Sequence, residues 1–201
     1  MQILLALLAC LGSSAFLLPP VPALGRAAIR LDASPSESTK TGEVGEYFFR
    51  RGVREEQRAI QEVMVRMTMN PTSIDTDNFL CAEEKGTGAL IGFGQVKPIG
   101  ESSYELASLY VAESYRQRGL GSRLVRQLVE DFLSTHESTE VGEGELYLLT
   151  LAKTAPFYEK NGFAVIPAKD APVTLKLEHA AGSVLQFFFG NSLVCMQPAS
   201  D

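Results

Sequence analysis

The sequence predicts a mixed α/β (α+β) fold in which helices flank both faces of one central mixed sheet. From residue 46 onward, strand-like segments and amphipathic helical segments follow one another in a β-α-β-β-β-α-β-α-β order. With 201 residues and 45% hydrophobic content, the chain can bury one sizeable core but is too short for several domains. We therefore expect a single globular domain.

The predicted strands are short apolar runs bounded by turn signals. They cover residues 46–51, 79–84, 89–97, 103–112, 145–151 and 192–197, and a further strand starts at Phe163. The tetrapeptide KGTG at residues 85–88 predicts a hairpin between the second and third strands.

Each predicted helix has one apolar face. The first places Ile60, Val63, Met64 and Met67 at i, i+3, i+4 and i+7 and ends at Asn70-Pro71. The apolar face of the second is formed by Leu120, Leu124, Val125, Leu128, Val129 and Phe132. A short helix over residues 155–160 stops at Asn161-Gly162, and a last helix ends near Gly190.

Charge and cysteine content exclude several functional classes. Eighteen Lys and Arg residues against 24 Asp and Glu residues give a net charge of −6, which disfavours nucleic-acid binding. Cys10, Cys81 and Cys195 form no C-x-x-C pair, and His136 and His179 are the two histidines, so we expect no metal site. Cys81 and Cys195 are expected to be buried and both histidines solvated.

The first forty residues have the composition of a presequence. Residues 3–11 form an apolar run about half as long as the ~20 residues of a membrane-spanning helix, and Ser13-Ser14-Ala15 fits a signal-peptide cleavage site. Residues 16–38 are rich in Ala, Ser and Pro and poor in acids, like a transit peptide.

We therefore expect a presequence over residues 1–40, with a signal peptide at about 1–15 and a transit-like segment after it. A mature domain, not embedded in a membrane, is expected over residues 42–199. The arrangement resembles the bipartite plastid presequences of algae. A buried N-terminal helix is one alternative, and delivery to the secretory pathway lumen or secretion is another.

The segment RQRGLG at residues 116–121 lies between a predicted strand and the start of a predicted helix. Glycines allow close approach of the backbone to a ligand, and a helix N-terminus attracts anions such as phosphate. Gly121 is followed by Ser122 and Arg123 and not by Lys, which excludes a Walker A loop. Arg123 and Leu124 stand where the dinucleotide fingerprint needs its third glycine, which excludes that motif. A tight turn without a ligand is the alternative.

The spacing R-x-x-G-x-G, five residues after a strand ending in Val111, resembles the coenzyme A signature of the GNAT superfamily of N-acetyltransferases. The segment PFYEKNGF at residues 156–163 is similar to the F-Y-E-K-x-G-F segment of that family. The resemblance covers roughly residues 46–163 and extends to plastid-type, single-domain GNAT proteins of plants and algae. It implies the GNAT fold, in which two parallel strands of the sheet splay apart.

This resemblance also implies an acetyl-CoA-dependent N-acetyltransferase in which a primary amine attacks the thioester directly, without a metal. The strand residues Leu109, Tyr110 and Val111 would pair with the pantetheine, and an N–H near Leu109 would polarise the thioester carbonyl. The pyrophosphate would be bound by Arg116, Gln117, Arg118, Gly119, Leu120, Gly121 and Ser122.

Two side chains are candidate catalysts. Glu105 lies six residues before Val111, where a subset of the family places a catalytic base, and strand alternation predicts Glu105, Leu109 and Val111 on one face. Tyr158 matches the family tyrosine that protonates the leaving thiolate. A solvated Glu105 with a water relay, and a Tyr158 that only packs, are the alternatives at residue level.

For the whole protein, the alternatives are a non-catalytic acyl-CoA-binding module and transfer of another acyl group. The resemblance implies that the acceptor contacts residues 64–77 and the loops after the terminal helix. Asp75 and Asp77 in the first of these segments could favour a cationic amine.

Overall fold

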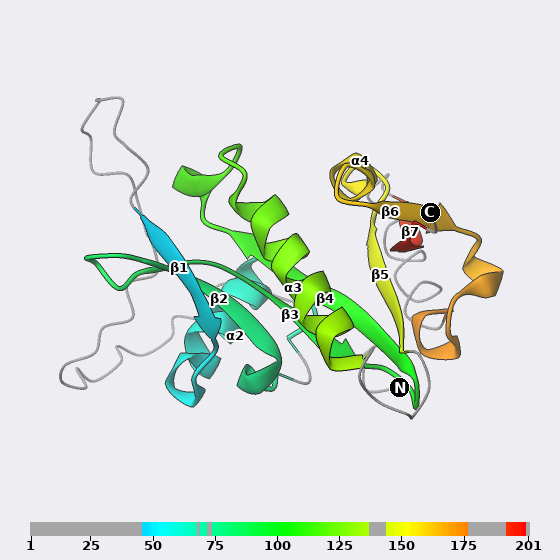
Figure 1. The fold of residues 1–201 in the computed structure, drawn as a ribbon, viewed down its shortest axis with the longest axis horizontal. Helices are drawn as coiled ribbons and strands as arrows, with labels where there is room; N and C mark the ends of the chain where they lie inside the picture. The colour runs from blue at the N-terminus through cyan, green and yellow to red at the C-terminus, as the bar shows by residue number, and fades with distance from the viewer. Residues whose placement is uncertain (1–45, 68, 72–73, 137–143, 177–191, 200–201) are drawn as a thin grey trace, which may run out of the picture.

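The computed structural model describes residues 46–67, 69–71, 74–136, 144–176 and 192–199. Within them, one seven-stranded sheet has the order β1-β2-β3-β4-β5-β7-β6 (Figure 1). The predicted mixed α/β fold is confirmed. The expected presequence, the predicted helix ending near Gly190 and His179 lie outside the described residues.

The strands agree with the predicted segments to within two residues at each end. They are β1 (Tyr47–Arg51), β2 (Phe79–Glu84), β3 (Leu90–Pro98), β4 (Ser103–Val111), β5 (Glu145–Leu151), β6 (Phe163–Ile166) and β7 (Leu193–Pro198). Neighbouring strands pair antiparallel except β4 and β5, which are parallel. The sheet is therefore mixed, and its single parallel pair lies near its middle.

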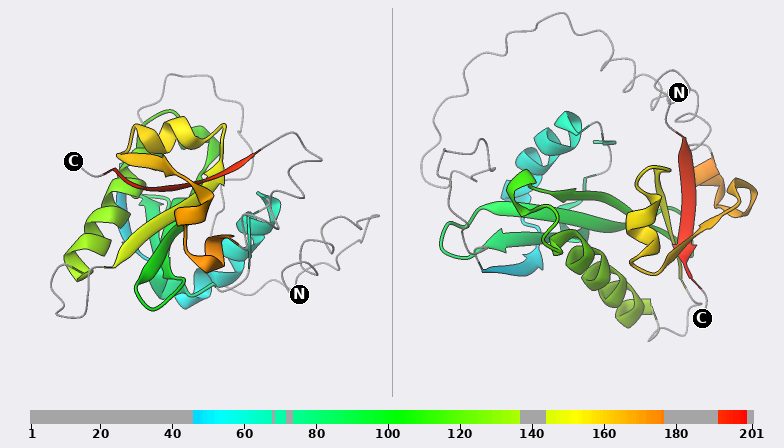
Figure 2. Two further views of the ribbon diagram at one scale, coloured as in Figure 1. Left: turned by 90° about the vertical axis from the view of Figure 1, so that its right-hand side faces the viewer. Right: turned by 90° about the horizontal axis from the view of Figure 1, so that it is seen from above.

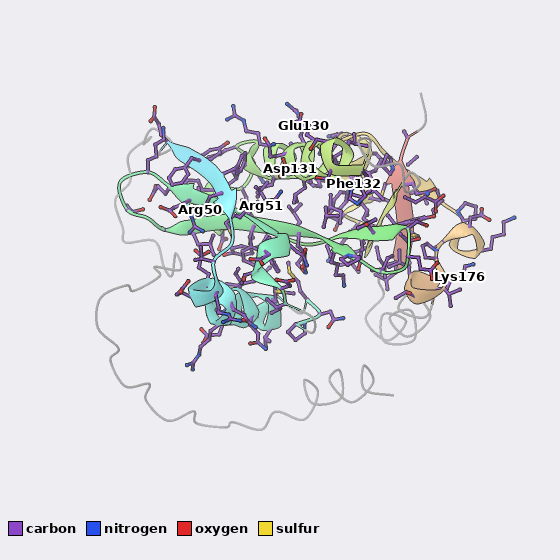
Figure 3. The ribbon with its side chains drawn as sticks, turned by 60° about the horizontal axis from the view of Figure 1, so that its bottom comes forward. Arg50, Arg51, Glu130, Asp131, Phe132 and Lys176 are labelled. Carbon is purple, nitrogen blue, oxygen red and sulfur yellow. The ribbon has the colours of Figure 1, made fainter. Side chains whose placement is uncertain are left out.

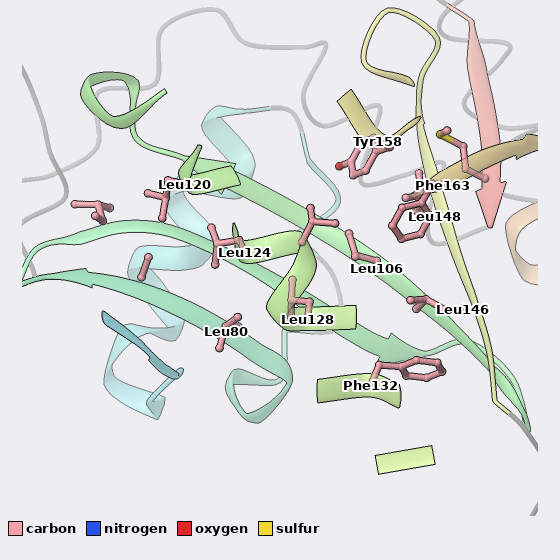
Figure 4. Packing of buried hydrophobic residues seen from close by; sticks show 14 of the residues in the cluster. Leu80, Leu106, Leu120, Leu124, Leu128, Phe132, Leu146, Leu148, Tyr158 and Phe163 are labelled. Carbon is pink, nitrogen blue, oxygen red and sulfur yellow. The ribbon is translucent and has the colours of Figure 1, made fainter. Parts of the chain in front are cut away.

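Helices α2 (Gln57–Arg66) and α3 (Leu120–His136) lie on opposite faces of the sheet, and the short α4 (Ala155–Glu159) follows β5 (Figure 2). The apolar stripe of α3 forms the main core, because Leu120, Leu124, Val125, Leu128 and Phe132 are buried against the sheet (Figure 4). In α2 the buried residues are Ile60, Val63 and Met64. The prediction that Met67 shares this face is wrong, since α2 ends at Arg66 and Met67 is 42% exposed.

Ion pairs connect the N-terminal strand to its neighbours. Arg51 at the end of β1 pairs with Asp131 of α3 at 2.9 Å. Figure 3 labels both residues. The adjacent Arg50 pairs with Glu56 at 2.5 Å and with Glu83 of β2 at 2.5 Å. Glu56 is 3% exposed and also accepts the N–H of Val53 at 3.1 Å. We call Arg50, Glu56 and Glu83 the Arg50 clasp.

The Arg50 clasp changes the acidity of its members. Burial alone would disfavour the charged form of Glu56, but hydrogen bonds from Arg50 and from the Val53 N–H outweigh it and lower the pKa of Glu56 below its ordinary 4.5. The hydrogen bond to Glu56 correspondingly raises the pKa of Arg50. The folded state therefore favours the ionised form of both Glu56 and Arg50.

The two described cysteines are buried, as predicted. Cys81 is 0% exposed and Cys195 is 2% exposed, and burial raises their pKa values to about 12 and about 11. The expectation of a solvated His136 is wrong: its ring stacks on Phe132 at 4.3 Å and meets Tyr104 edge-on at 4.4 Å. Among the described helices, none is long and apolar enough to cross a membrane.

Candidate active site

Strands β4 and β5 pair over three residues and then separate. Their partners are Ser103 with Glu145, Tyr104 with Leu146 and Glu105 with Tyr147. Beyond this point β5 pairs with β7, starting at Leu148 with Met196, while β4 continues toward α3 (Figure 1). The splay predicted for these parallel strands is confirmed, and from Leu106 to Val111 the β5-facing edge of β4 has no strand partner in the described structure.

Backbone groups of β4 point toward this open edge. The N–H of Ala112 donates to the carbonyl of Ile91 on β3 at 2.8 Å. Because successive N–H groups of a strand alternate between its two edges, those of Val111 and Leu109 face away from β3. Tyr110 presents its backbone to β3 instead, and its ring packs on Phe93 at 5.1 Å. An extended ligand can therefore pair with Leu109 and Val111.

A β-bulge in β4 decides which side chains face which helix. Phe93 pairs with Tyr110 and Gln95 with Ala107, so both Ser108 and Leu109 lie opposite Gly94. Ser108 has φ +56°. A Cβ at Gly94 would lie 2.8 Å from Leu128 and 3.2 Å from Leu109, which explains why this position is a glycine.

The bulge overturns the prediction that Glu105, Leu109 and Val111 share a face. Leu109 and Val111 pack against the cluster that contains α3. Glu105 lies on the opposite face, across the register from Lys97 of β3. Strand alternation holds only while the pairing is regular, and the extra residue at the bulge reverses it.

Glu105 is buried at the closed end of the splay. It is 5% exposed, and its Oε2 lies 3.0 Å from the Nζ of Lys97. The alternative prediction, that Glu105 is a solvated carboxylate, is therefore wrong. Lys97 was not singled out from the sequence, because its place beside Glu105 follows from the register of two strands rather than from a local motif.

The RQRGLG segment forms a loop that exposes consecutive amides at the start of α3. Gln117 and Gly119 have positive φ values of 60° and 83°. The N–H of Arg123 donates to Gly119 at 3.0 Å, whereas the N–H groups of residues 117–122 have no acceptor among the described residues. Together with the positive end of a 17-residue helix, this cradle suits an anion such as a pyrophosphate.

Neighbouring side chains hold the loop in place. The Nε of Arg116 donates to the carbonyl of Val111 at 3.0 Å, and the hydroxyl of Tyr115 donates to Glu84 at the end of β2. Leu120 is 1% exposed and packs in the main core, so it anchors the loop to the start of α3. Arg118 is exposed beside the loop and can add positive charge.

Tyr158 reaches the same region from α4. It is 8% exposed, and its ring packs edge-on against Phe157 and Phe163 at 5.0 and 6.2 Å. Figure 4 shows its hydroxyl directed away from Phe163, toward the side of β4 and the start of α3. Burial raises the pKa of Tyr158 to about 12. The phenol is therefore a neutral proton donor at physiological pH.

The two sequence motifs meet in space. A Cβ at Gly121 would lie 3.4 Å from the ring of Phe157, so the start of α3 and α4 approach each other beside Tyr158.

Asp75 and Asp77 are exposed, and the carboxylate of Asp75 accepts the N–H of Asp77 at 3.1 Å. In the described ranges no cluster of three or more His, Cys, Asp or Glu residues could hold a metal.

Comparison with known proteins identifies the fold. The family model described as acetyltransferase (GNAT) domain matches residues 75–165. A search of curated proteins by sequence gave no match.

Among solved structures, N-acetylglutamate synthase from Neisseria gonorrhoeae complexed with coenzyme A and L-arginine is similar, with TM-score 0.58 and 16% identity over 79% of this chain and 34% of that one. Rv2747 from Mycobacterium tuberculosis, in complex with CoA, gives TM-score 0.52 and 18% identity over 74% and 97% of the two chains. A putative GNAT-family acetyltransferase from Desulfovibrio desulfuricans gives 0.50 and 19% over 77% and 99%.

The chain spans about a third of the length of the N-acetylglutamate synthase structures that it matches. At these identities the structural similarity establishes the fold. The protein has the fold of the GNAT acetyltransferases, and its residues 75–165 match the domain of that family.

Proposed function

We propose that this protein is a GNAT-family N-acetyltransferase that binds acetyl-CoA in the splay between β4 and β5 and transfers the acetyl group to a primary amine. One observation carries the proposal: the open edge of β4 at Val111, the amide loop at Gly121 and α4, which carries Tyr158, lie together where β4 and β5 separate, a region that we call the opening. Two of the similar structures contain coenzyme A, which supports the assignment of this ligand.

Each part of the opening matches one part of acetyl-CoA. The loop amides of residues 117–122 bind the pyrophosphate, with Arg118 adding charge. The N–H groups of Val111 and Leu109 bind the extended pantetheine. The N–H of Leu109 then points at the thioester carbonyl and stabilises the negative charge that develops on its oxygen.

The proton acceptor and the proton donor of the proposed reaction lie on opposite faces of the sheet. Glu105, on the α2 face, takes the proton that the attacking ammonium must lose, since an alkylammonium has a pKa of about 10. As the C–N bond forms and the C–S bond breaks, Tyr158 donates its proton to the departing CoA sulfur. Neither step requires a metal.

Binding and turnover by the full chain test the proposal. Isothermal titration is expected to show binding of CoA and acetyl-CoA. Thiol release from acetyl-CoA is expected with at least one amine from a panel of amino acids, polyamines, aminoglycosides and peptides. If neither nucleotide binds, the proposal is wrong. If both bind and no amine supports thiol release, the protein is an acyl-CoA-binding module.

A pair of glycine variants shows whether binding occurs at the assigned loop. Gly121→Glu places a carboxylate in the anion cradle and is expected to abolish CoA binding. Gly100→Glu introduces the same side chain in the turn between β3 and β4, where a Cβ meets only Ser103 at 3.6 Å. This control is expected to bind CoA as the wild type does, and equal binding by both variants would remove the loop from the site.

A further inference from the structure

The bulge in β4 holds a serine in a conformation that serine rarely adopts. Ser108 has φ +56°, in the left-handed region where the Cβ of an L-residue crowds the backbone. The peptide that joins Ser108 to Leu109 carries the N–H of Leu109. The backbone angles of Ser108 therefore set the direction of that N–H.

The side chain of Gln95 holds Ser108 from the neighbouring strand. Gln95 pairs with Ala107 in the register, and its Nε2 donates to the Oγ of Ser108 at 3.0 Å. Gln95 is 1% exposed, so water does not compete with this hydrogen bond.

Folding stability alone does not account for a glutamine at this position. Its Oε1 is buried and receives no hydrogen bond from any described residue. A buried amide oxygen without a donor disfavours the folded state and offsets the hydrogen bond that the same side chain makes to Ser108, so stability alone does not require a glutamine there. Two residues earlier on the same face of β3, Phe93 is fully buried in an apolar cluster.

We propose that Gln95 is a positioning residue for the acetyl transfer: by binding Ser108 it keeps the bulge in its left-handed conformation and thereby aims the Leu109 N–H at the thioester carbonyl. This inference rests on the proposed function, because the direction of that N–H affects a rate only where a thioester lies beside β4. If Ser108 relaxed to an ordinary extended conformation, the peptide would rotate and the N–H would leave the open edge.

Substitution of Gln95 by methionine tests whether the reaction rate depends on the Gln95 amide. Gln95→Met keeps the length of the side chain and removes the amide. We expect kcat to fall on the order of 10- to 100-fold, because a donor to the developing oxyanion is misaligned. The Kd for CoA, which has no acyl carbonyl, is expected to change less than about 2-fold. Tm is expected to change little, because the hydrogen bond lost at Ser108 and the unpaired oxygen removed offset each other. An unchanged kcat overturns the proposal.

The matched control is Gln127→Met. Gln127 also donates through its Nε2, to Asp131 at 2.9 Å, but lies on α3 away from the bulge. Its kcat is expected to equal that of the wild type. A loss of rate equal to that of Gln95→Met would show a general effect of removing an amide and would overturn the positioning role.

A glycine at position 108 tests the mechanism. Glycine adopts positive φ without strain, so Ser108→Gly can keep the bulge without help from Gln95. We expect Gln95→Met to reduce kcat less than about 3-fold when introduced into the Ser108→Gly variant. If the reduction is as large as in the wild-type background, Gln95 does not act through Ser108 and the proposal fails.

A measurement without substrate separates this proposal from the proposed function. The backbone amide signal of Leu109 in an NMR spectrum is expected to shift in Gln95→Met and to shift less when the same substitution is made in Ser108→Gly. An unchanged Leu109 signal overturns the role of Gln95 even if the wild type acetylates no amine. Failure of the wild type to turn over, with the signal shifted as expected, overturns the proposed function and its catalytic consequence, and leaves the control of the Leu109 N–H by Gln95 in place.

Discussion

The phenol of Tyr158 is buried and forms no hydrogen bond with a described residue, so its chemistry can be tested without disturbing the fold. Tyr158→Phe removes the hydroxyl and keeps the ring packing on Phe157 and Phe163. We expect kcat to fall about 100-fold, the scale of general acid catalysis, with the Kd for CoA unchanged. Steady-state kinetics and titration measure the two effects.

The control for this variant is Tyr104→Phe. Tyr104 lies on β4 but packs on Phe132 and His136 of α3, away from the opening. It is expected to retain the wild-type rate. Full activity of Tyr158→Phe on a true substrate would leave Tyr158 with a packing role only.

Variants of Glu105 and of its partner Lys97 separate the role of Glu105 as a base from the role of the ion pair. Glu105→Gln preserves the shape of the side chain but removes its capacity to accept a proton, so kcat is expected to fall about 100-fold. Lys97→Gln breaks the same 3.0 Å ion pair while retaining the carboxylate, and a smaller loss is expected. Rate profiles between pH 6 and 9 measure both. Equal losses in the two variants would show that the proposed reaction depends on the ion pair and not on proton transfer by Glu105.

Single residues show where reasoning from sequence succeeds and fails. The amide loop and Tyr158 could be predicted, because each belongs to a contiguous motif on one turn or helix. The bulge at Ser108 could not be predicted. One inserted residue moves the side chains of all later residues of β4 to the other face of the sheet. The residue that accommodates the bulge, Gly94, lies on the neighbouring strand and not in β4. His136 was predicted to be solvated because no local pattern reveals its contact with Tyr104.

The Arg50 clasp connects β1 to β2 and to the residue before α2, and we expect its contribution to the stability of the protein to depend on pH. Because the folded state lowers the pKa of Glu56, the clasp stabilises the protein fully above pH 4.5 and progressively less as the pH falls through the lowered value. Glu56→Gln should reduce the free energy of unfolding at pH 7 by about 2 kcal/mol, less than a fully buried pair would lose. The Arg50 side chain is in fact 26% exposed.

Urea unfolding at pH 7 and pH 3 measures this effect. The difference between wild type and Glu56→Gln is expected to narrow at pH 3, because below pH 4.5 the unfolded chain binds a proton at Glu56 that the folded state binds less readily. Glu62→Gln is the control, since Glu62 forms an exposed pair with Arg58 on α2 and is expected to change stability by less than about 0.5 kcal/mol. A difference that is the same at both pH values would contradict the assignment.

Elements were predicted better than their contacts. The period of two in strands and the apolar stripe of α3 are local properties, so the boundaries agree closely with the structure. The pairing of Lys97 with Glu105 depends on register, and the period of a strand specifies its faces but not its partners.

Among the residues that the structure describes, the sheet consists of two parts joined by the three residue pairs between β4 and β5. In the proposed complex, pantetheine pairs with the open edge and links the two parts. We expect CoA to slow amide hydrogen exchange at Leu109 and Val111 and in β5, while the centre of β2 changes little. At a CoA concentration of about 100 times Kd, mass action adds about 2.7 kcal/mol of stability. Exchange that slows nowhere along β4 would place the ligand elsewhere.

The short pairing between β4 and β5 leaves the sheet with a seam. Fewer backbone hydrogen bonds cross this seam than join the strands within either part, and the side chains of the main core connect the two parts there. A ligand that bridges the seam restores bending stiffness across the whole sheet. Coenzyme A bound in this way would be a substrate carrier and, for the duration of each turnover, a structural member of the fold.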